Sequence, residues 1–147
     1  MYWQIKPYIG DNETLYGENL YGEHSIHYDK LNAYWHLFGI NDGERWYGWD
    51  EVKEFSKIIG VPHVPELLRT VLNDESEVKA IIDEIMTHPS TYNDTEKEGV
   101  VMRLTDSYGI DDFPNCVCKW VRPHHVQTDE HWTRNWKKAQ LLYEESV

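Results

Sequence analysis

A strand-like segment carries a charge at each end in the stretch Glu98-Gly-Val-Val-Met-Arg103. Its centre is a glycine followed by β-forming residues, which is typical of a strand. A strand that only faced water would need polar side chains, not a carboxylate at one end and a guanidinium at the other. A carboxylate can bind a metal ion, and a cation can bind a phosphate. The segment therefore indicates a nucleotide site, with Glu98 as metal ligand and Arg103 as a secondary phosphate contact.

A lysine lies inside a second strand-like segment, residues 115–122. Alternation along a strand places Lys119 on the same face as two valines. Lysine is seldom found on an apolar strand face unless it has a functional role, so the pattern favours a cation that reaches a phosphate. Arg122 ends the segment as a further secondary phosphate contact. The alternative for both arginines is that they pair with the excess of acidic side chains.

Cysteine and histidine residues offer a competing metal site. Zinc prefers such ligands, and the chain has a short cluster of them: Cys116, Cys118, His124, His125 and His131. A C-x-C pair on a strand is not the usual zinc knuckle, which has two residues between the cysteines, so structural zinc is disfavoured. The two cysteines share a strand face, where a disulfide would be strained, so we expect free thiols and a reducing compartment.

The composition limits the classes of partner. The 147 residues carry 26 acidic and 14 basic side chains, a net charge of −12, which argues against binding nucleic acid through charge alone. Seven Trp and ten Tyr could serve as core or as stacking platforms for bases. Basic side chains gather in the interval 119–138, where a phosphate-facing surface is expected. The first ten residues contain no apolar signal region, and no run is long enough to span a membrane, so a cytoplasmic protein is expected.

The elements that would position these residues predict an α+β fold, with a mostly antiparallel sheet and flanking helices. Strands are expected at 14–22, 32–40, 44–48, 98–104 and 115–122, the second of them central because it is apolar on both faces. Helices are expected at 49–60, with Asp50 as N-cap and Gly60 at the end, at 75–88 and at 129–145. Residues 105–114 are expected to form a polar loop. No repeat or linker divides the chain, so residues 1–147 are expected to form one domain.

Two segments in the first third of the chain resemble motifs of the RNA ligases, a branch of the ATP-dependent covalent nucleotidyltransferases. The stretch YGENLYGEHSIHY (16–28) resembles the segment whose glutamate holds the ribose, which here is Glu18. The stretch YWHLFGI (34–40) resembles the motif whose aromatic ring stacks on adenine, which here is Phe38. Without the resemblance, Phe38 would be taken as a core residue.

The two charged strands resemble the family's later motifs, in the family's order. The stretch EGVVMR (98–103) resembles the motif whose glutamate faces metal and nucleotide, which implies this role for Glu98. The stretch CVCKWVR (116–122) resembles the last motif, whose lysine reaches the α-phosphate, which implies this role for Lys119. The resemblance runs from residue 14 to about 138 and is closest to phage-style RNA ligases, more than to DNA ligases or capping enzymes.

The family's first motif, which carries the nucleophilic lysine, has no counterpart before Glu18. Only Lys6 precedes it, and Lys6 is followed by proline at the wrong spacing, so it is not assigned as the nucleophile. In the last motif, Val117 stands where the family often has a further lysine. The resemblance therefore covers the C-terminal two-thirds of an adenylation domain that is incomplete at its N-terminal side: a half of a split ligase, a truncation or a remnant.

The resemblance implies a reaction, its cofactors and its partners. ATP would donate AMP to a lysine and then to a nucleic-acid 5′-phosphate, with Mg²⁺ or Mn²⁺ at Glu98 and RNA or DNA ends as substrates. The alternative is a non-catalytic remnant or partner subunit that binds nucleotide or RNA. An incomplete sheet would expose an edge, so we expect self-association or a covering partner chain.

Overall fold

The computed structural model describes residues 2–23, 27–123 and 137–144. They form helices and antiparallel sheets, which confirms the predicted α+β class. The chain divides into two compact units. Unit 1 comprises residues 1–21, 33–64 and 101–118, and unit 2 comprises residues 22–32, 65–100 and 119–147. The assignment of residues 1–147 to one domain stays a prediction.

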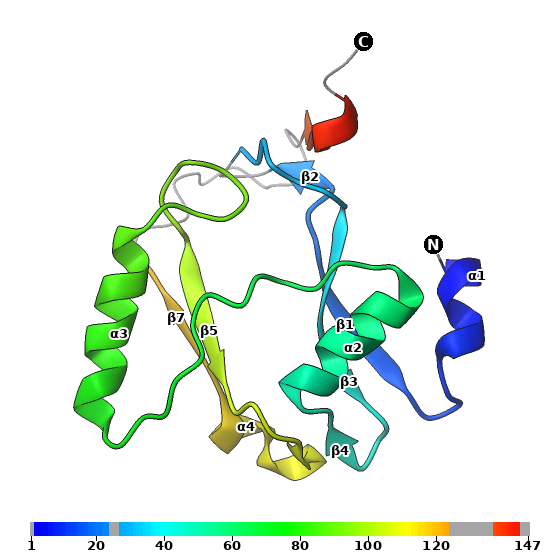
Figure 1. Ribbon diagram of the computed structural model, residues 1–147, viewed down its shortest axis with the longest axis horizontal. Coiled ribbons are helices and arrows are strands. Elements are labelled where there is room, and N and C mark those ends of the chain that lie inside the picture. Colours follow the sequence, from blue (N-terminus) through cyan, green and yellow to red (C-terminus); the bar gives the residue numbers. More distant parts are fainter. Residues whose placement is uncertain (1, 24–26, 124–136, 145–147) are drawn as a thin grey trace. The chain divides into compact units, whose positions relative to one another are not determined.

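Unit 1 is built on a four-stranded sheet with the order β1-β3-β4-β6 (Figure 1). Its strands are β1 (Thr14–Asn19), β3 (Trp35–Asn41), β4 (Arg45–Trp46) and β6 (Tyr108–Gly109). All three pairings in this sheet are antiparallel. As predicted, β3 is central, and the turn between β3 and β4 contains Gly43 with φ of 90°, a value that favours glycine.

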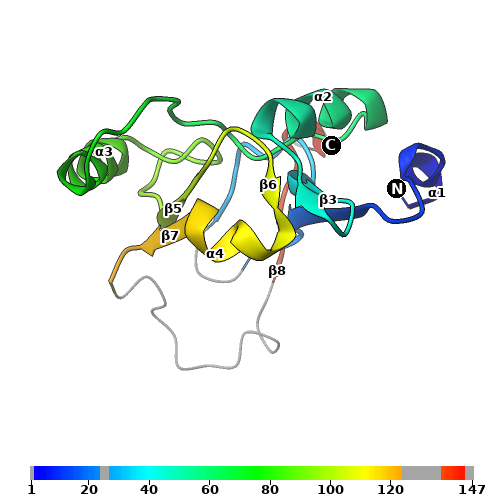
Figure 2. The ribbon, with the colours of Figure 1, turned by 90° about the horizontal axis from the view of Figure 1, so that it is seen from below.

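Helix α2 (Trp49–Ile59) covers one face of β3 (Figures 1 and 2). The core between them consists of Leu37, Ile40, Trp49 and Val52. The helix begins after Gly48, whose N–H donates to the carboxylate of Glu51 at 2.7 Å, so the N-cap prediction of Asp50 was wrong by two residues. The helix ends at Gly60, as predicted, in the left-handed conformation with φ of 66°.

Short elements complete unit 1. The N-terminal segment forms α1 (Tyr2–Ile5) and a 3₁₀ turn η1 (Lys6–Tyr8), neither of which was predicted. The predicted loop 105–114 instead contains β6, the 3₁₀ turn η2 (Ile110–Asp112) and the start of α4 (Phe113–Cys116). Across the described residues, no helix has the length and apolar character that a bilayer crossing requires.

Unit 2 contains α3 (Glu75–Thr87), whose N-cap Asp74 accepts hydrogen bonds from the N–H groups of Ser76 and Glu77. The short strand β2 (Gly22–Glu23) pairs with β8 (Lys137–Lys138). The 3₁₀ turn η3 (Leu142–Glu144) follows β8.

The helix predicted at 129–145 is wrong at residues 137–141, and among the described residues of this interval the helical part is the 3₁₀ turn η3. Residues 124–136 lie outside the described residues. Residues 137–138 are held in β8 by β2, and Leu141 forms a bridge with Leu31. These pairings with distant segments override the local helical pattern, since propensity is a weak prior against tertiary contacts.

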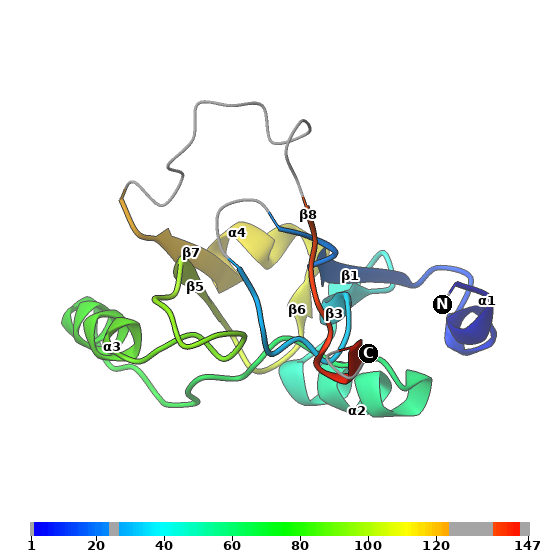
Figure 3. The ribbon, with the colours of Figure 1, turned by 90° about the horizontal axis from the view of Figure 1, so that it is seen from above.

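Strands β5 (Gly99–Arg103) and β7 (Val117–Val121) form a separate pair (Figures 1 and 3). At one end the N–H of Leu104 donates to the carbonyl of Cys116, and at the other the N–H of Arg122 donates to the carbonyl of Glu98. The first bond lies within unit 1 and the second within unit 2. The division between the units falls within both strands.

Candidate functional site

A β-bulge at Phe38 gives the two faces of β3 different roles. Tyr16 pairs with Gly39 and Gly17 with Leu37, so Phe38 is the extra residue of β3. The extra residue shifts the alternation, so that Leu37 and the isoleucine three positions later both pack against α2. Phe38 lies on the opposite face and is 38% exposed. Within unit 1, Phe38 is therefore an open aromatic ring and not part of the core under α2.

Glu18 lies on the same face as Phe38. In the β1–β3 pair it stands opposite His36, and cross-strand partners share a face. His36 is buried, and burial lowers its pKa, so the imidazole is neutral at pH 7. Glu18 itself is exposed. An exposed carboxylate and an exposed ring on one sheet face can accept hydrogen bonds from sugar hydroxyls and stack on a base.

Three further aromatic rings lie on this face of the sheet. The ring of Trp46 lies between Tyr16, at 4.8 Å between centroids, and Phe113, at 4.9 Å. Gly39 leaves room for the indole, because a Cβ there would lie 3.2 Å from it. The sequence analysis did not single out Trp46 or Phe113. A glycine between apolar strand residues was the available signal, since it marks a close approach by a large neighbour.

Arg103, at the end of β5, supports the bulge. Its guanidinium donates to the carbonyl of Phe38 at 2.8 Å and to the carbonyl of Tyr47 at 3.0 Å, and it lies over the ring of Trp49. Burial lowers the pKa of Arg103. A bulge leaves backbone groups without a ladder partner, and here the arginine supplies the donor. Its contacts within unit 1 are those of a structural cation, and a contact with phosphate stays a prediction.

In unit 2, a buried lysine anchors the segment that leads into Glu98. Lys97 is only 8% exposed, and its ammonium donates to three carbonyls, of Ile85 at 3.0 Å, His88 at 2.6 Å and Pro89 at 2.9 Å. These carbonyls belong to the last turn of α3 and the residues just after it, where a helix lacks donors of its own. Burial lowers the pKa of Lys97. Sequence reasoning missed this residue, although a helix end without basic residues was a signal for an external cation.

Glu98 is held by backbone contacts on both sides. Its carbonyl accepts from the N–H of Arg122 at 2.9 Å, and the carbonyl of Lys97 accepts from the Arg122 side chain at 2.7 Å. Gly99 follows because the backbone of Trp120 runs so close that a Cβ would collide with its carbonyl oxygen. The pairing of β5 and β7 therefore explains the dipeptide Glu-Gly, and it fixes the backbone of Glu98, whose side chain is half-buried.

The other two predicted residues of unit 2, Arg122 and Lys119, differ in their contacts and in their exposure to solvent. Arg122 forms an ion pair with Glu96, which matches the alternative in which it pairs with acid. Lys119 is exposed on β7, so its side chain is open to solvent. Its role at a phosphate stays a prediction.

The structure sorts the six predicted residues between the two units. Unit 1 contains Glu18, Phe38 and Arg103. Unit 2 contains Glu98, Lys119 and Arg122. Within unit 1 the register brings Glu18 and Phe38 onto one face, and within unit 2 the backbone of Arg122 bonds directly to that of Glu98.

No metal cluster emerges from the residues that the structure describes. Within the ranges 2–23, 27–123 and 137–144, no three His, Cys, Asp or Glu side chains are placed to hold one ion. The three histidines of the zinc alternative lie outside these ranges. Cys116 at the end of α4 and Cys118 on β7 are free thiols.

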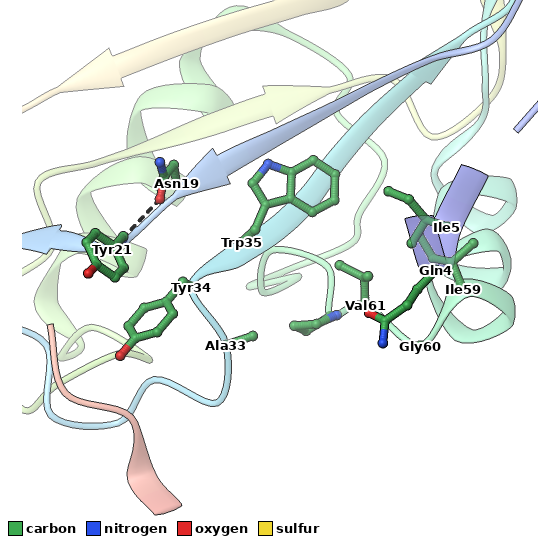
Figure 4. Close-up of a pocket in the computed structure, with 11 residues that line it drawn as sticks. Gln4, Ile5, Asn19, Tyr21, Ala33, Tyr34, Trp35, Ile59, Gly60 and Val61 are labelled. Carbon is green, nitrogen blue, oxygen red and sulfur yellow. Dashed lines mark hydrogen bonds between the residues drawn. The ribbon is translucent and has the colours of Figure 1, made fainter. Parts of the chain in front are cut away.

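A pocket of about 470 Å³ lies on the other face of unit 1, at the edge of α2. Figure 4 shows Tyr34 and Trp35 in its middle, with Tyr21 and Asn19 toward one end and Gln4 toward the other. The remaining lining residues are apolar or glycine: Ile5, Ala33, Ile59, Gly60, Val61 and Pro62. No charged side chain lines this pocket.

Comparison with known protein families identifies a match. The family described as RNA ligase matches residues 3–121 of the chain. This interval contains all six residues of the candidate site except Arg122. No curated protein and no solved structure matches the chain.

Proposed function

Because the chain belongs to the RNA ligase family, we propose that it is a nucleotidyltransferase module that joins RNA ends with ATP through a lysyl-AMP intermediate. The observation that carries the proposal is the open face of β1 and β3, where the bulge presents the ring of Phe38 on the same face as the exposed residue Glu18. On this face Phe38 stacks on adenine and Glu18 accepts hydrogen bonds from the ribose.

The reaction is phosphoryl transfer in three steps. A lysine amine attacks the α-phosphorus of ATP, the bond to pyrophosphate breaks, and the amine loses a proton. The AMP then moves to an RNA 5′-phosphate, and a 3′-hydroxyl displaces AMP to form the new phosphodiester. Such transfers depend on positioning and on neutralising charge. Lys119 supplies a point charge to the α-phosphate, and Arg122 is a secondary contact.

The proposal does not assign the nucleophilic lysine to a residue of this chain. Lys6, in η1, is followed by Pro7 and has its ammonium 5.4 Å from the ring centroid of Trp3. Neither feature corresponds to the family's first motif, so Lys6 is not assigned as the nucleophile. Lys97 is also unsuited, because its ammonium is held by three carbonyls. We therefore propose that activity requires a lysine-bearing segment beyond these 147 residues.

A divalent ion, Mg²⁺ or Mn²⁺, fits a site at which the protein contributes one carboxylate, that of Glu98. Glu98 is a half-buried carboxylate at the start of β5. Magnesium in nucleotide sites is commonly held by one or two carboxylates together with phosphate oxygens and water. Glu98 would hold the ion with the nucleotide's own phosphates, and the ion would neutralise part of the phosphate charge.

The alternative function is a non-catalytic piece that binds nucleotide or RNA, or a partner subunit of a ligase. The absence of a suitable lysine among residues 1–147 favours this alternative for the chain by itself. DNA ends in place of RNA ends are a further version of the first proposal.

Labelling and calorimetry together test the proposal. The chain is incubated with α-³²P-ATP and Mg²⁺, separated under denaturing conditions, and assayed in parallel for ATP binding. We expect no labelled band, but ATP binding that is weakened in Phe38→Ala and Glu98→Gln. Tyr143→Ala, which removes an aromatic ring that is 72% exposed and outside the site, should bind ATP normally. A labelled band would show that a lysine of this chain is the nucleophile, and no ATP binding would refute the nucleotide site.

The edge of the sheet supports the proposed self-association or partner chain. Among the described strands, β1 pairs only with β3, so its other edge carries no strand in unit 1. An open strand edge is a template for pairing with another chain. Light scattering during size exclusion should show a mass that rises with concentration, and a monomer at every concentration would contradict the proposal.

A further inference from the structure

The pocket at the edge of α2 is separate from the proposed nucleotide site. Asn19 pairs with Trp35 at the end of the β1–β3 register, and both line the pocket. Their chain neighbours Glu18 and His36 point to the opposite face, because successive strand residues alternate. One sheet therefore carries two distinct ligand-sized surfaces, of which the proposed function uses only the face of Glu18 and Phe38.

The walls of this pocket are fixed by backbone hydrogen bonds. The N–H of Leu37 donates to the carbonyl of Pro62 at 2.8 Å, which ties the pocket floor to β3. Val61 is held twice by the buried Ser56, whose hydroxyl donates to the Val61 carbonyl at 2.5 Å and whose carbonyl accepts from the Val61 N–H at 3.1 Å. On the other side, the carbonyl of Tyr34 accepts from the N–H of Leu20 at 2.7 Å. The pocket is thus preformed, which lowers the cost of ligand binding.

The chemistry of the lining selects a neutral, planar ligand. Tyr21 and Tyr34 meet edge to face at 5.0 Å, and Trp35 continues the aromatic wall. The amides of Asn19 and Gln4 lie at opposite ends, and an amide offers both a donor and an acceptor. The Asn19 oxygen already accepts from the N–H of Tyr21 at 3.1 Å, which leaves its NH₂ group and a second lone pair for a ligand. No lining residue is charged, which disfavours a phosphate or a metal ion. A nucleobase has this combination of an aromatic face and an edge of donors and acceptors.

The charge of the chain also favours recognition through bases. With a net charge of −12, the protein gains little from counterion release when it approaches a nucleic acid. Stacking on aromatic side chains does not need positive charge and accepts any base. We propose that this pocket binds an unpaired base of the single-stranded RNA end. This inference rests on the proposed function and names a subsite for its substrate.

Fluorescence anisotropy with a labelled single-stranded oligouridylate tests the pocket, because this RNA has no adenine that could enter the proposed nucleotide site at Phe38. Tyr34→Leu removes the ring but keeps an apolar side chain, and it should weaken RNA binding about tenfold, as expected for the loss of one base–aromatic stack. ATP binding by calorimetry should be unchanged in this variant. Phe38→Leu is the matched control on the other face of the sheet: it should weaken ATP binding and leave the binding of oligouridylate intact.

Other outcomes separate this inference from the proposed function. If Tyr34→Leu and Tyr21→Leu both bind RNA like the unaltered chain, or if an oligomer with abasic sites binds equally well, the base pocket is refuted. The nucleotide site is then tested by the ATP-binding measurements alone. Failure of the unaltered chain to bind RNA would also refute the pocket. A steep decrease in RNA affinity with salt would do so as well, because it would show that phosphate contacts dominate.

Crosslinking gives a test that does not depend on how the variants fold. RNA carrying 4-thiouridine is irradiated with the unaltered chain, and the modified peptides are identified by mass spectrometry. We expect crosslinks at Tyr21, Tyr34 or Trp35, and competition by unlabelled RNA. Crosslinks confined to other parts of the chain would overturn the assignment.

Discussion

Replacing Lys97 with methionine tests whether the cation at the end of α3 holds the start of β5 in place. Methionine keeps the unbranched apolar stem and removes the charge and all three donated hydrogen bonds. The carbonyls of Ile85, His88 and Pro89 then lose their donor in a place where Lys97 was only 8% exposed. The expected result is a large loss of stability in unit 2.

The magnitude follows from opposing terms. Hydrogen bonds from a charged donor contribute about 1.5–3 kcal/mol each, and a carbonyl left dry costs about 1–3 kcal/mol. Burial of the ammonium opposes this, which is why burial lowers the pKa of Lys97. The net effect is a loss of about 2–4 kcal/mol in the free energy of unfolding, a large share of the roughly 5–15 kcal/mol typical of a native protein.

Urea unfolding, followed by tryptophan fluorescence and circular dichroism, measures this loss. Lys79→Met is the matched control. Lys79 is on α3, pairs with Asp83 and is exposed, so its replacement should lower the free energy of unfolding by less than about 0.5 kcal/mol. If Lys97→Met and Lys79→Met unfold at the same urea concentration with equal slopes, the anchoring role of Lys97 is refuted. Hydrogen exchange should place the increased opening of Lys97→Met at the end of α3 and the start of β5.

Three further predictions concern unit 1 and the strand pair β5–β7. Arg103→Lys should lower thermal stability by about 1–3 kcal/mol, because one ammonium cannot bond the carbonyls of Phe38 and Tyr47 as a fork does; an unchanged melting temperature would contradict this. Gly99→Ala should cost about 1–3 kcal/mol through the collision with the Trp120 carbonyl, whereas Gly10→Ala, where a Cβ lies no closer than 3.4 Å to any neighbour, should be tolerated in the same melting experiment. The hydrogen bond from Tyr47 to Glu13 and burial raise the pKa of Tyr47 to about 12. Since the unfolded chain loses this proton near pH 10, unfolding free energy should fall between pH 10 and 12 in the unaltered chain, and a fall just as steep in Tyr47→Phe would count against the assignment.

Periodic segments with clear ends were predictable from the sequence. The helix at 49–60 was predicted to within a residue, because its apolar spacing and terminal Gly60 both act locally. The strands at 98–104 and 115–122 were also found, since glycine and β-formers mark them. Local signals suffice where neighbours along the chain decide the conformation.

Features that depend on distant partners could not be predicted. The bulge at Phe38 arises from the pairing of β1 with β3; Gly39 within the strand is compatible with a bulge but does not show which residue is the extra one. The strand at Lys137–Lys138 exists because β2 lies beside it, against a local helical pattern. Lys97 was not singled out and Arg103 was predicted as a phosphate contact, yet both donate to backbone carbonyls that folding leaves without donors. The partner of Arg103 is 65 residues away, and those of Lys97 are 8 to 12 residues away, beyond the strand in which the sequence was interpreted.

The bulge also changes what a deletion would mean in β3. In a regular strand, the loss of one residue moves every side chain beyond it to the other face of the sheet, which exposes core residues and destabilises the fold. Here residues 35–37 and 39–41 are already out of phase by one position at Phe38. Removing Phe38 would bring the strand back into phase, so that Ile40 keeps its place under α2 while the exposed ring is lost. Phe38 is thus an insertion in an otherwise regular strand ladder. The exposed ring could be removed while the pairing of β1 with β3 is kept.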